Sequence, residues 1–135
     1  KPAQAVYALC RAHHAGLHGG VLPAALRALL HTSRHLYPTF GPAERDACAH
    51  WQAQAARAVA EALPPGAPEA GEVLAFLERV ASDLVRGRSG FIERLTPANY
   101  GAYPASAVAC TAEGLLDAQR ALGHLGRARA AAELE

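Results

Sequence analysis

The sequence predicts an all-α protein, folded as an irregular antiparallel bundle of five to seven helices. A stack of helical hairpins is the alternative architecture. Three observations carry this prediction. Alanine, the strongest helix former, supplies much of a hydrophobic content of 51%. Prolines such as Pro23 and Pro42 stand where a helix would begin, a position that tolerates the missing N–H. Apolar residues recur at helical spacings, and no stretch alternates with the two-residue period of a strand.

Length and punctuation favour a single helical domain over residues 1–135. A chain of 135 residues is long enough to bury a core of its own. The proline-rich segment 64–68 is a clear helix break. The alternative is that this break divides the chain into two helical halves.

Three helices are expected in the first half, over 2–15, 22–36 and 42–63. Gly16 ends the first, and Pro38 with Gly41 closes the second, because neither residue type continues a helix well. Small residues on the third helix would let a neighbouring helix approach closely. The positions expected to face the core are Val6, Leu9, Cys10, His13, Leu22, Leu26, Leu29, Leu30, Ala47, Cys48, Trp51, Ala55, Val59 and Leu63.

The second half predicts a helix over 69–86, capped by Gly87, and a short helix over 89–95. An irregular loop is expected at 96–104, and a last long helix at 105–122. The apolar positions expected inside are Val73, Phe76, Leu77, Val80, Leu84, Phe91, Ile92, Leu95, Val108, Leu115 and Leu116.

Charge and cysteine usage limit the classes of function. The formal net charge is +1, so the whole chain exerts no electrostatic attraction on nucleic acid or on anionic lipid. No run approaches the roughly 20 apolar residues of a membrane span. Cys10, Cys48 and Cys110 are odd in number and form no CxxC motif, which indicates free thiols in a reducing compartment. We therefore expect a cytoplasmic protein whose partners include neither nucleic acid nor a membrane.

Motifs of the common enzymes are missing from the sequence. There is no GxSxG elbow, no glycine-rich phosphate loop and no paired-carboxylate site. The leading hypothesis is a non-enzymatic helical protein-interaction module, or scaffold domain, whose partner is another protein. A small enzyme with an unfamiliar site is the less favoured alternative, and alanine-rich faces would also permit a homo-oligomer.

Two features of the second half predict the partner-binding surface. Arginines surround a turn expected at 87–90, and guanidinium forks match the oxygens of a phosphate or an acidic peptide. Two tyrosines lie in the loop at 96–104, where such side chains make good contacts. The alternatives are arginines paired with interleaved acidic residues at a solvated helix end, and tyrosines folded back over the core. The predicted partner-binding residues are Arg86, Arg88, Arg94, Tyr100 and Tyr103, with Arg79 nearby.

The histidines predict a competing function. His14 and His18 are four residues apart, as are His31 and His35, and imidazoles at this spacing on one helix can share a metal ion such as zinc. Gly16 interrupts the first pair, and no carboxylate completes an HExxH pattern around either one. Solvated polar positions are therefore the favoured interpretation, and no metal site is assigned.

A short resemblance to the globins points to haem instead. Residues 9–14 resemble the proximal-histidine helix of that family, and residues 40–42 followed by Trp51 resemble the start of its last helix. The resemblance covers less than half the chain and implies a permuted order of helices. It implies a haem-binding helical domain with His13 and His14 as the cofactor-binding residues. A ligand-binding helical domain that uses the histidine-rich first half, as in the effector-binding domain of a regulator, is the other form of this alternative. The alternative is that His13 lines the core.

Overall fold

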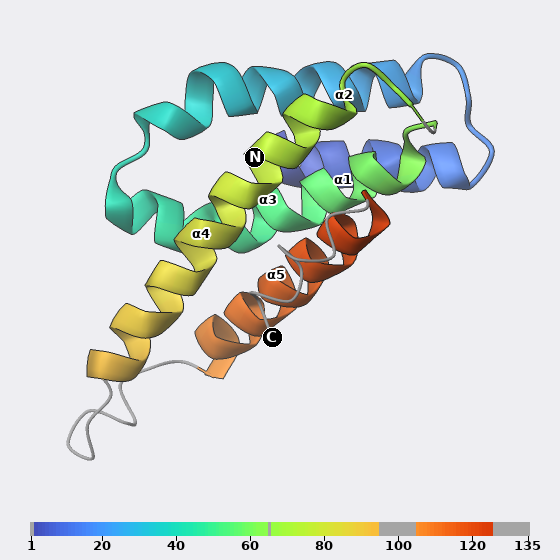
Figure 1. Ribbon diagram of the computed structural model, residues 1–135. Coiled ribbons are helices and arrows are strands. Elements are labelled where there is room, and N and C mark those ends of the chain that lie inside the picture. The colour runs from blue at the N-terminus through green and yellow to red at the C-terminus, as the bar shows by residue number, and fades with distance from the viewer. Residues whose placement is uncertain (1, 65, 95–104, 126–135) are drawn as a thin grey trace.

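The computed structural model is a bundle of helices (Figure 1). It describes residues 2–64, 66–94 and 105–125, with the side chains of residues 46, 87–94 and 105–108 excepted. Within those ranges every regular element is helical, so the all-α prediction is confirmed. The elements are α1 (Pro2–His14), α2 (Val21–His31), a π-helical turn (Thr32–Leu36), a 3₁₀ turn (Tyr37–Thr39), α3 (Pro42–Ala62), α4 (Ala70–Arg94) and α5 (Ala105–His124).

Consecutive helices run in opposite directions around α3, as Figure 1 shows. Helix α3 packs extensively against α1, α4 and α5, and α2 covers α1. The predicted break at 64–68 is the connection from α3 to α4, and α3 packs against helices that precede and follow it. The short connections between helices account for the antiparallel order.

The alanines of α3 explain how one helix can have three close neighbours. Ala49, Ala53, Ala56 and Ala60 recur at spacings of three and four and are all buried. Side chains of this size let the helix axes approach closely. The nearest approach is at Gly114 of α5, where an added Cβ would lie 2.8 Å from the Cα of His50.

Glycine ends α1 as predicted. Gly16 has a φ of +93°, a left-handed conformation that favours glycine. The N–H of Leu17 donates to the carbonyl of Ala12, and the N–H of Gly16 donates to the carbonyl of His13. This pair of bonds is the Schellman motif, which satisfies the last carbonyls of a helix.

The second helix does not continue regularly to residue 36 as expected. The hydroxyl of Thr32 donates to the carbonyl of Ala28, a back-bond that bends helices. Pro38 has no N–H to donate to the preceding turn. The chain widens into the π-helical turn, in which the N–H of Tyr37 donates to the carbonyl of Thr32. This turn sets the direction in which Tyr37 enters the core.

The predicted helix end at Gly87, and with it the turn at 87–90, is wrong, because α4 continues without interruption to Arg94. A glycine inside a helix costs only about 1 kcal/mol relative to alanine. The apolar spacing also continues past it, since Phe91 lies seven residues after Leu84. With no proline between 69 and 94, nothing in the segment forbids the helix.

Most predicted core positions with described side chains are confirmed, and three are wrong, whereas Phe91, Ile92, Leu95 and Val108 lie outside the described side chains. Trp51 is 40% exposed and Leu116 is 52% exposed, and Ala47 is also exposed. On α3 the buried face is that of the alanines, which turns Trp51 outward. The large, fully buried side chains are Tyr37, Phe76, Leu29, Leu77, Leu122, Val6, Val59, Val73 and Val80.

Candidate functional site

The arginine cluster, which we define as Tyr37, Arg45, Arg79, Asp83 and Arg86, is the most elaborate polar group among the described side chains. Tyr37 is 1% exposed, and its hydroxyl donates to Oδ2 of the buried Asp83 at 2.7 Å. The guanidinium of Arg86 donates to Oδ1 of the same carboxylate. Both carboxylate oxygens are therefore bound, which is what a buried charge requires.

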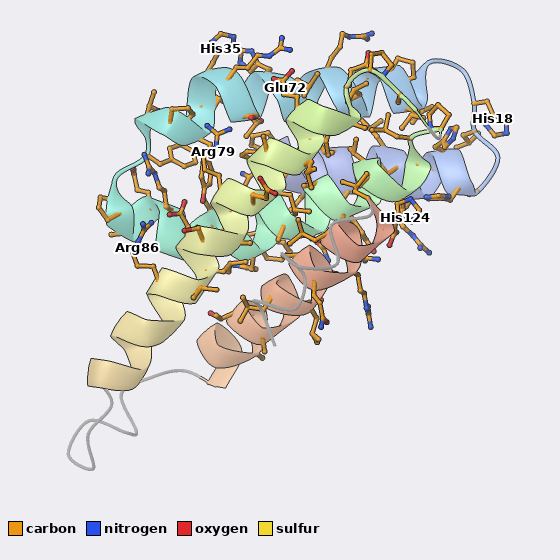
Figure 2. All side chains as sticks on the ribbon, viewed as in Figure 1. His18, His35, Glu72, Arg79, Arg86 and His124 are labelled. Atoms are coloured by element: carbon orange, nitrogen blue, oxygen red, sulfur yellow. The ribbon has the colours of Figure 1, made fainter. Side chains whose placement is uncertain are left out.

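Arg79 and Arg86 lie on the same side of α4 because they are seven residues apart (Figure 2). Nη2 of Arg79 donates to the hydroxyl of the buried Ser33 at 3.0 Å, and its guanidinium lies 5.7 Å from the ring centre of Phe76. Arg86 is 59% exposed although one of its five N–H donors is bound to Asp83. The guanidiniums of both arginines remain accessible from outside the bundle.

Arg45 approaches Tyr37 from the first turns of α3. Its guanidinium lies 5.8 Å from the centre of the Tyr37 ring, within the range of a cation–π interaction. Its Nη2 donates to the carbonyl of Pro38 at 3.2 Å, and its Nε is buried without a hydrogen-bond partner. The ring of Phe76 meets that of Tyr37 edge to face, at 5.4 Å between centres.

The electrostatics of the cluster are visible at Tyr37. Burial raises the pKa of its hydroxyl to about 12, and the thiol of Cys48 acts in the same direction. The guanidiniums of Arg45, Arg86 and Arg79 lower the pKa in turn, in that order of effect. Three positive groups thus face one hydroxyl, with Asp83 as the carboxylate bound to it. The arrangement suits the recognition of a further anionic group.

The structure gives the positions of only some of the predicted partner-binding residues, and it does not test their role. Arg86 is exposed and belongs to the arginine cluster. Its bond to Asp83 is the acidic pairing that the alternative interpretation expected. Arg88 and Arg94 lie on the last turns of α4, where side chains are not described, and Tyr100 and Tyr103 lie outside the described residues. Their role stays a prediction.

Sequence reasoning missed Tyr37, Arg45 and the role of Asp83. These residues come from three segments that only the folded chain brings together. The one local signal was Tyr37 before Pro38 at a helix end, where an aromatic side chain is directed by the turn rather than by helical periodicity.

A second polar group, the histidine end, comprises His13, His14 and His18. The ring centre of His13 lies 5.1 Å from that of His18 and 6.0 Å from that of His14. Nδ1 of His13 is buried without a hydrogen-bond partner, whereas His14 and His18 are exposed. The predicted pairing of His14 with His18 is replaced by one of His13 with His18. In Figure 2, His18 lies at the opposite end of the bundle from Arg86.

These surroundings do not fit a haem at His13. Among the described residues, its ring neighbours are two imidazoles, and the loop that follows α1 is exposed from Ala15 to Gly20. A haem needs a pocket whose polarity and access to solvent are controlled. Nothing further is derived through haem. The described residues also hold no group of three or more histidine, cysteine or acidic side chains arranged for a metal ion.

The cysteines are free thiols, with Cys10 buried and Cys48 and Cys110 half-buried. Burial raises the pKa of Cys10 to about 11, and burial is also the largest cause of the raised pKa of Cys48. Thiols with raised pKa values are poor nucleophiles at neutral pH.

Comparison with protein-family models, with curated proteins and with solved structures finds no match to the chain. None of the helices in the described ranges combines the length and the apolar character needed to cross a membrane.

Proposed function

We propose that the chain is a helical protein-interaction module that binds an acidic segment of a partner protein at the arginine cluster. The observation that carries this proposal is a group of three guanidiniums beside the buried Tyr37–Asp83 bond, one bonded to that carboxylate and two lying over adjoining aromatic rings. Arg79 and Arg86 offer exposed heads for one or two carboxylates. Arginine is the residue best suited to such contacts, because its planar fork binds both oxygens of a carboxylate.

The cluster is held in place before a partner arrives. Ser33 and Phe76 position Arg79, Asp83 positions Arg86, and the Tyr37 ring supports Arg45. Immobilising a long side chain on binding costs about 0.5–1.5 kcal/mol of binding free energy. Side chains that are already oriented avoid part of that loss.

A protein partner suits the cluster better than nucleic acid does. The positive groups occupy one end of a chain whose net charge is only +1. Acidic side chains are also interleaved, since Glu72 pairs with Arg34 beside the cluster. Nucleic acid binding depends on many simultaneous phosphate contacts, typically about six to ten. A local group of three arginines matches a short acidic motif.

The test uses fluorescence anisotropy with a labelled glutamate-rich peptide and a twin in which glutamine replaces every glutamate. Wild-type protein is expected to bind the acidic peptide, more weakly at high salt, and not its twin. The double variant Arg79→Gln/Arg86→Gln should lose roughly tenfold or more in affinity, which corresponds to about 1.4 kcal/mol. A double variant of Arg11 and Arg27, both exposed outside the cluster, lowers the net charge equally and serves as the control.

The outcomes separate the alternatives clearly. Equal losses in both double variants would show attraction to net charge alone and would contradict a site. Preference for duplex DNA over the acidic peptide would assign the cluster to phosphate instead. The predicted contributions of Arg88 and Tyr103 are tested by adding Arg88→Glu and Tyr103→Ala, which should weaken binding further.

A further inference from the structure

The histidine end carries an inference that is independent of the arginine cluster. The imidazoles of His13 and His18 meet edge to face, with ring centres 5.1 Å apart and an interplanar angle of 78°. They come from the last turn of α1 and from the loop behind it. We propose that His13 and His18 form a two-imidazole site for a divalent transition metal ion of the Zn²⁺ class.

The spacing of the rings fits a shared ion. Zinc lies about 2.0–2.1 Å from an imidazole nitrogen, and hence about 3.2 Å from the ring centre. Ring centres 5.1 Å apart then subtend about 105° at the ion, close to the tetrahedral angle. The 6.0 Å separation of His13 and His14 would require about 140°, which tetrahedral coordination does not allow. His14 is therefore not a ligand in this geometry.

The fold brings the pair together through the glycine at the end of α1. The Schellman motif at Gly16 reverses the chain, so that His18 returns toward the last helical turn. Gly20, with a φ of +80°, then starts α2. The site is built on a fixed backbone turn, although the residues of that turn are exposed.

Two further observations favour a cation at this place. Nδ1 of His13 is a buried nitrogen with no hydrogen-bond partner, which is an unfavourable state for a polar atom. The C-terminal end of a helix also carries partial negative charge, which stabilises a cation in its last turn. Since no third ligand residue converges within the described part of the chain, the remaining coordination positions are open to water or to an external ligand.

The molecule supplies its own matched control. His31 and His35 are both exposed, and their ring centres are 5.0 Å apart, nearly the spacing of the proposed pair. Because α2 passes directly into the π-helical turn at His31, the pair lacks a free helix end. If spacing alone determined binding, the two pairs would bind equally.

The experiment titrates Zn²⁺ into the metal-free full chain in competition with a chromophoric chelator. Wild-type protein should bind one equivalent of Zn²⁺, with a higher affinity than the variants of His13 and His18. His18→Gln and His13→Gln should each lower that affinity roughly tenfold or more, since even the loss of an outer-shell partner costs 10–100-fold. His31→Gln/His35→Gln should leave it unchanged. His18 is exposed, so its variant tests the site even where His13→Gln fails to fold.

Several results would overturn the proposal. One is wild-type affinity that does not change in His18→Gln, and another is loss of binding only in the His31→Gln/His35→Gln variant. Absence of any bound equivalent in wild-type protein would do the same. Cobalt, which occupies zinc sites, adds a spectroscopic readout, because its visible absorption reports tetrahedral coordination with nitrogen ligands.

Discussion

Tyr37→Phe is the most informative single substitution, because it removes one oxygen atom from the base of the arginine cluster. The ring of Tyr37 packs against Phe40 and Phe76, and phenylalanine preserves both contacts. Only the hydroxyl that donates to Asp83 at 2.7 Å is lost. The carboxylate oxygen then stays buried without that donor.

The expected cost follows from the type of bond. A hydrogen bond to a charged group contributes about 1.5–3 kcal/mol to stability. We expect Tyr37→Phe to lower the free energy of unfolding by about 2 kcal/mol, because Asp83 keeps its bond to Arg86. For a domain of this size the melting temperature should fall by roughly 5–10 °C. Thermal and urea unfolding followed by circular dichroism measure both quantities.

A double-mutant cycle with Asp83→Ala assigns the effect to this bond. Contacting residues in one network couple by about 0.5–3 kcal/mol, and we expect a value in the upper half of that range. Tyr7→Phe, which removes a hydroxyl from a half-buried tyrosine outside the cluster, is the control. A melting temperature unchanged by Tyr37→Phe, together with a coupling energy near zero, would refute the bond and the fixed base of the proposed binding site.

Three further predictions concern packing and pH. Gly114→Ala should destabilise the fold by about 1–3 kcal/mol, because its Cβ would lie 2.8 Å from the backbone of His50, whereas Gly123→Ala in the same helix meets no atom within 4 Å and should be neutral or stabilising in urea unfolding. Burial raises the pKa of Tyr37 to about 12 from a usual 10.0, so the stability contributed by this hydroxyl is fully present below pH 10 and should fall as the pH rises toward 12. Tyr37→Phe should remove this loss, measured by urea midpoints at each pH. The hydrogen bonds from Arg34 lower the pKa of Glu72 below its usual 4.5. The small contribution of this exposed pair to stability is therefore present at neutral pH and lost on acidification. Arg34→Gln should reduce the acid dependence of the melting temperature, with little effect at pH 7.

Helix placement could be predicted from the sequence wherever one strong local signal decided it. Pro42 marks the start of α3 and Gly16 the end of α1, and the structure agrees in both places. Prediction failed where a weak local signal opposed a tertiary one. Gly87 is of the residue type that caps a helix, but its cost inside a helix is small beside the gain from continuing α4.

The candidate sites were less predictable, for reasons that differ between them. Arg86 could be identified from its local density of arginines, but Tyr37, which binds the same Asp83 carboxylate, is 49 residues away from it in the chain. The contact depends on a π-helical turn that helical periodicity does not anticipate. At the histidine end, the four-residue spacing favoured His14 with His18. The left-handed conformation at Gly16 changed the register, so that His13 became the neighbour of His18.

The alanine-rich core explains why both sites lie at the ends of the bundle. Close packing around α3 depends on small side chains such as Ala53 and Ala56, and these carry no chemistry. Both proposed sites use a side chain from an irregular segment, Tyr37 after the π-helical turn and His18 in the loop behind α1. The chain accordingly departs from regular α-helix at the π-helical turn before α3 and at the Schellman motif after α1. Each irregular turn redirects the backbone and so brings together side chains that a regular helix would hold apart. Because both proposed sites are built beside these irregular turns, substitutions in the α3 interior should alter stability without altering the proposed binding of the acidic peptide or of Zn²⁺.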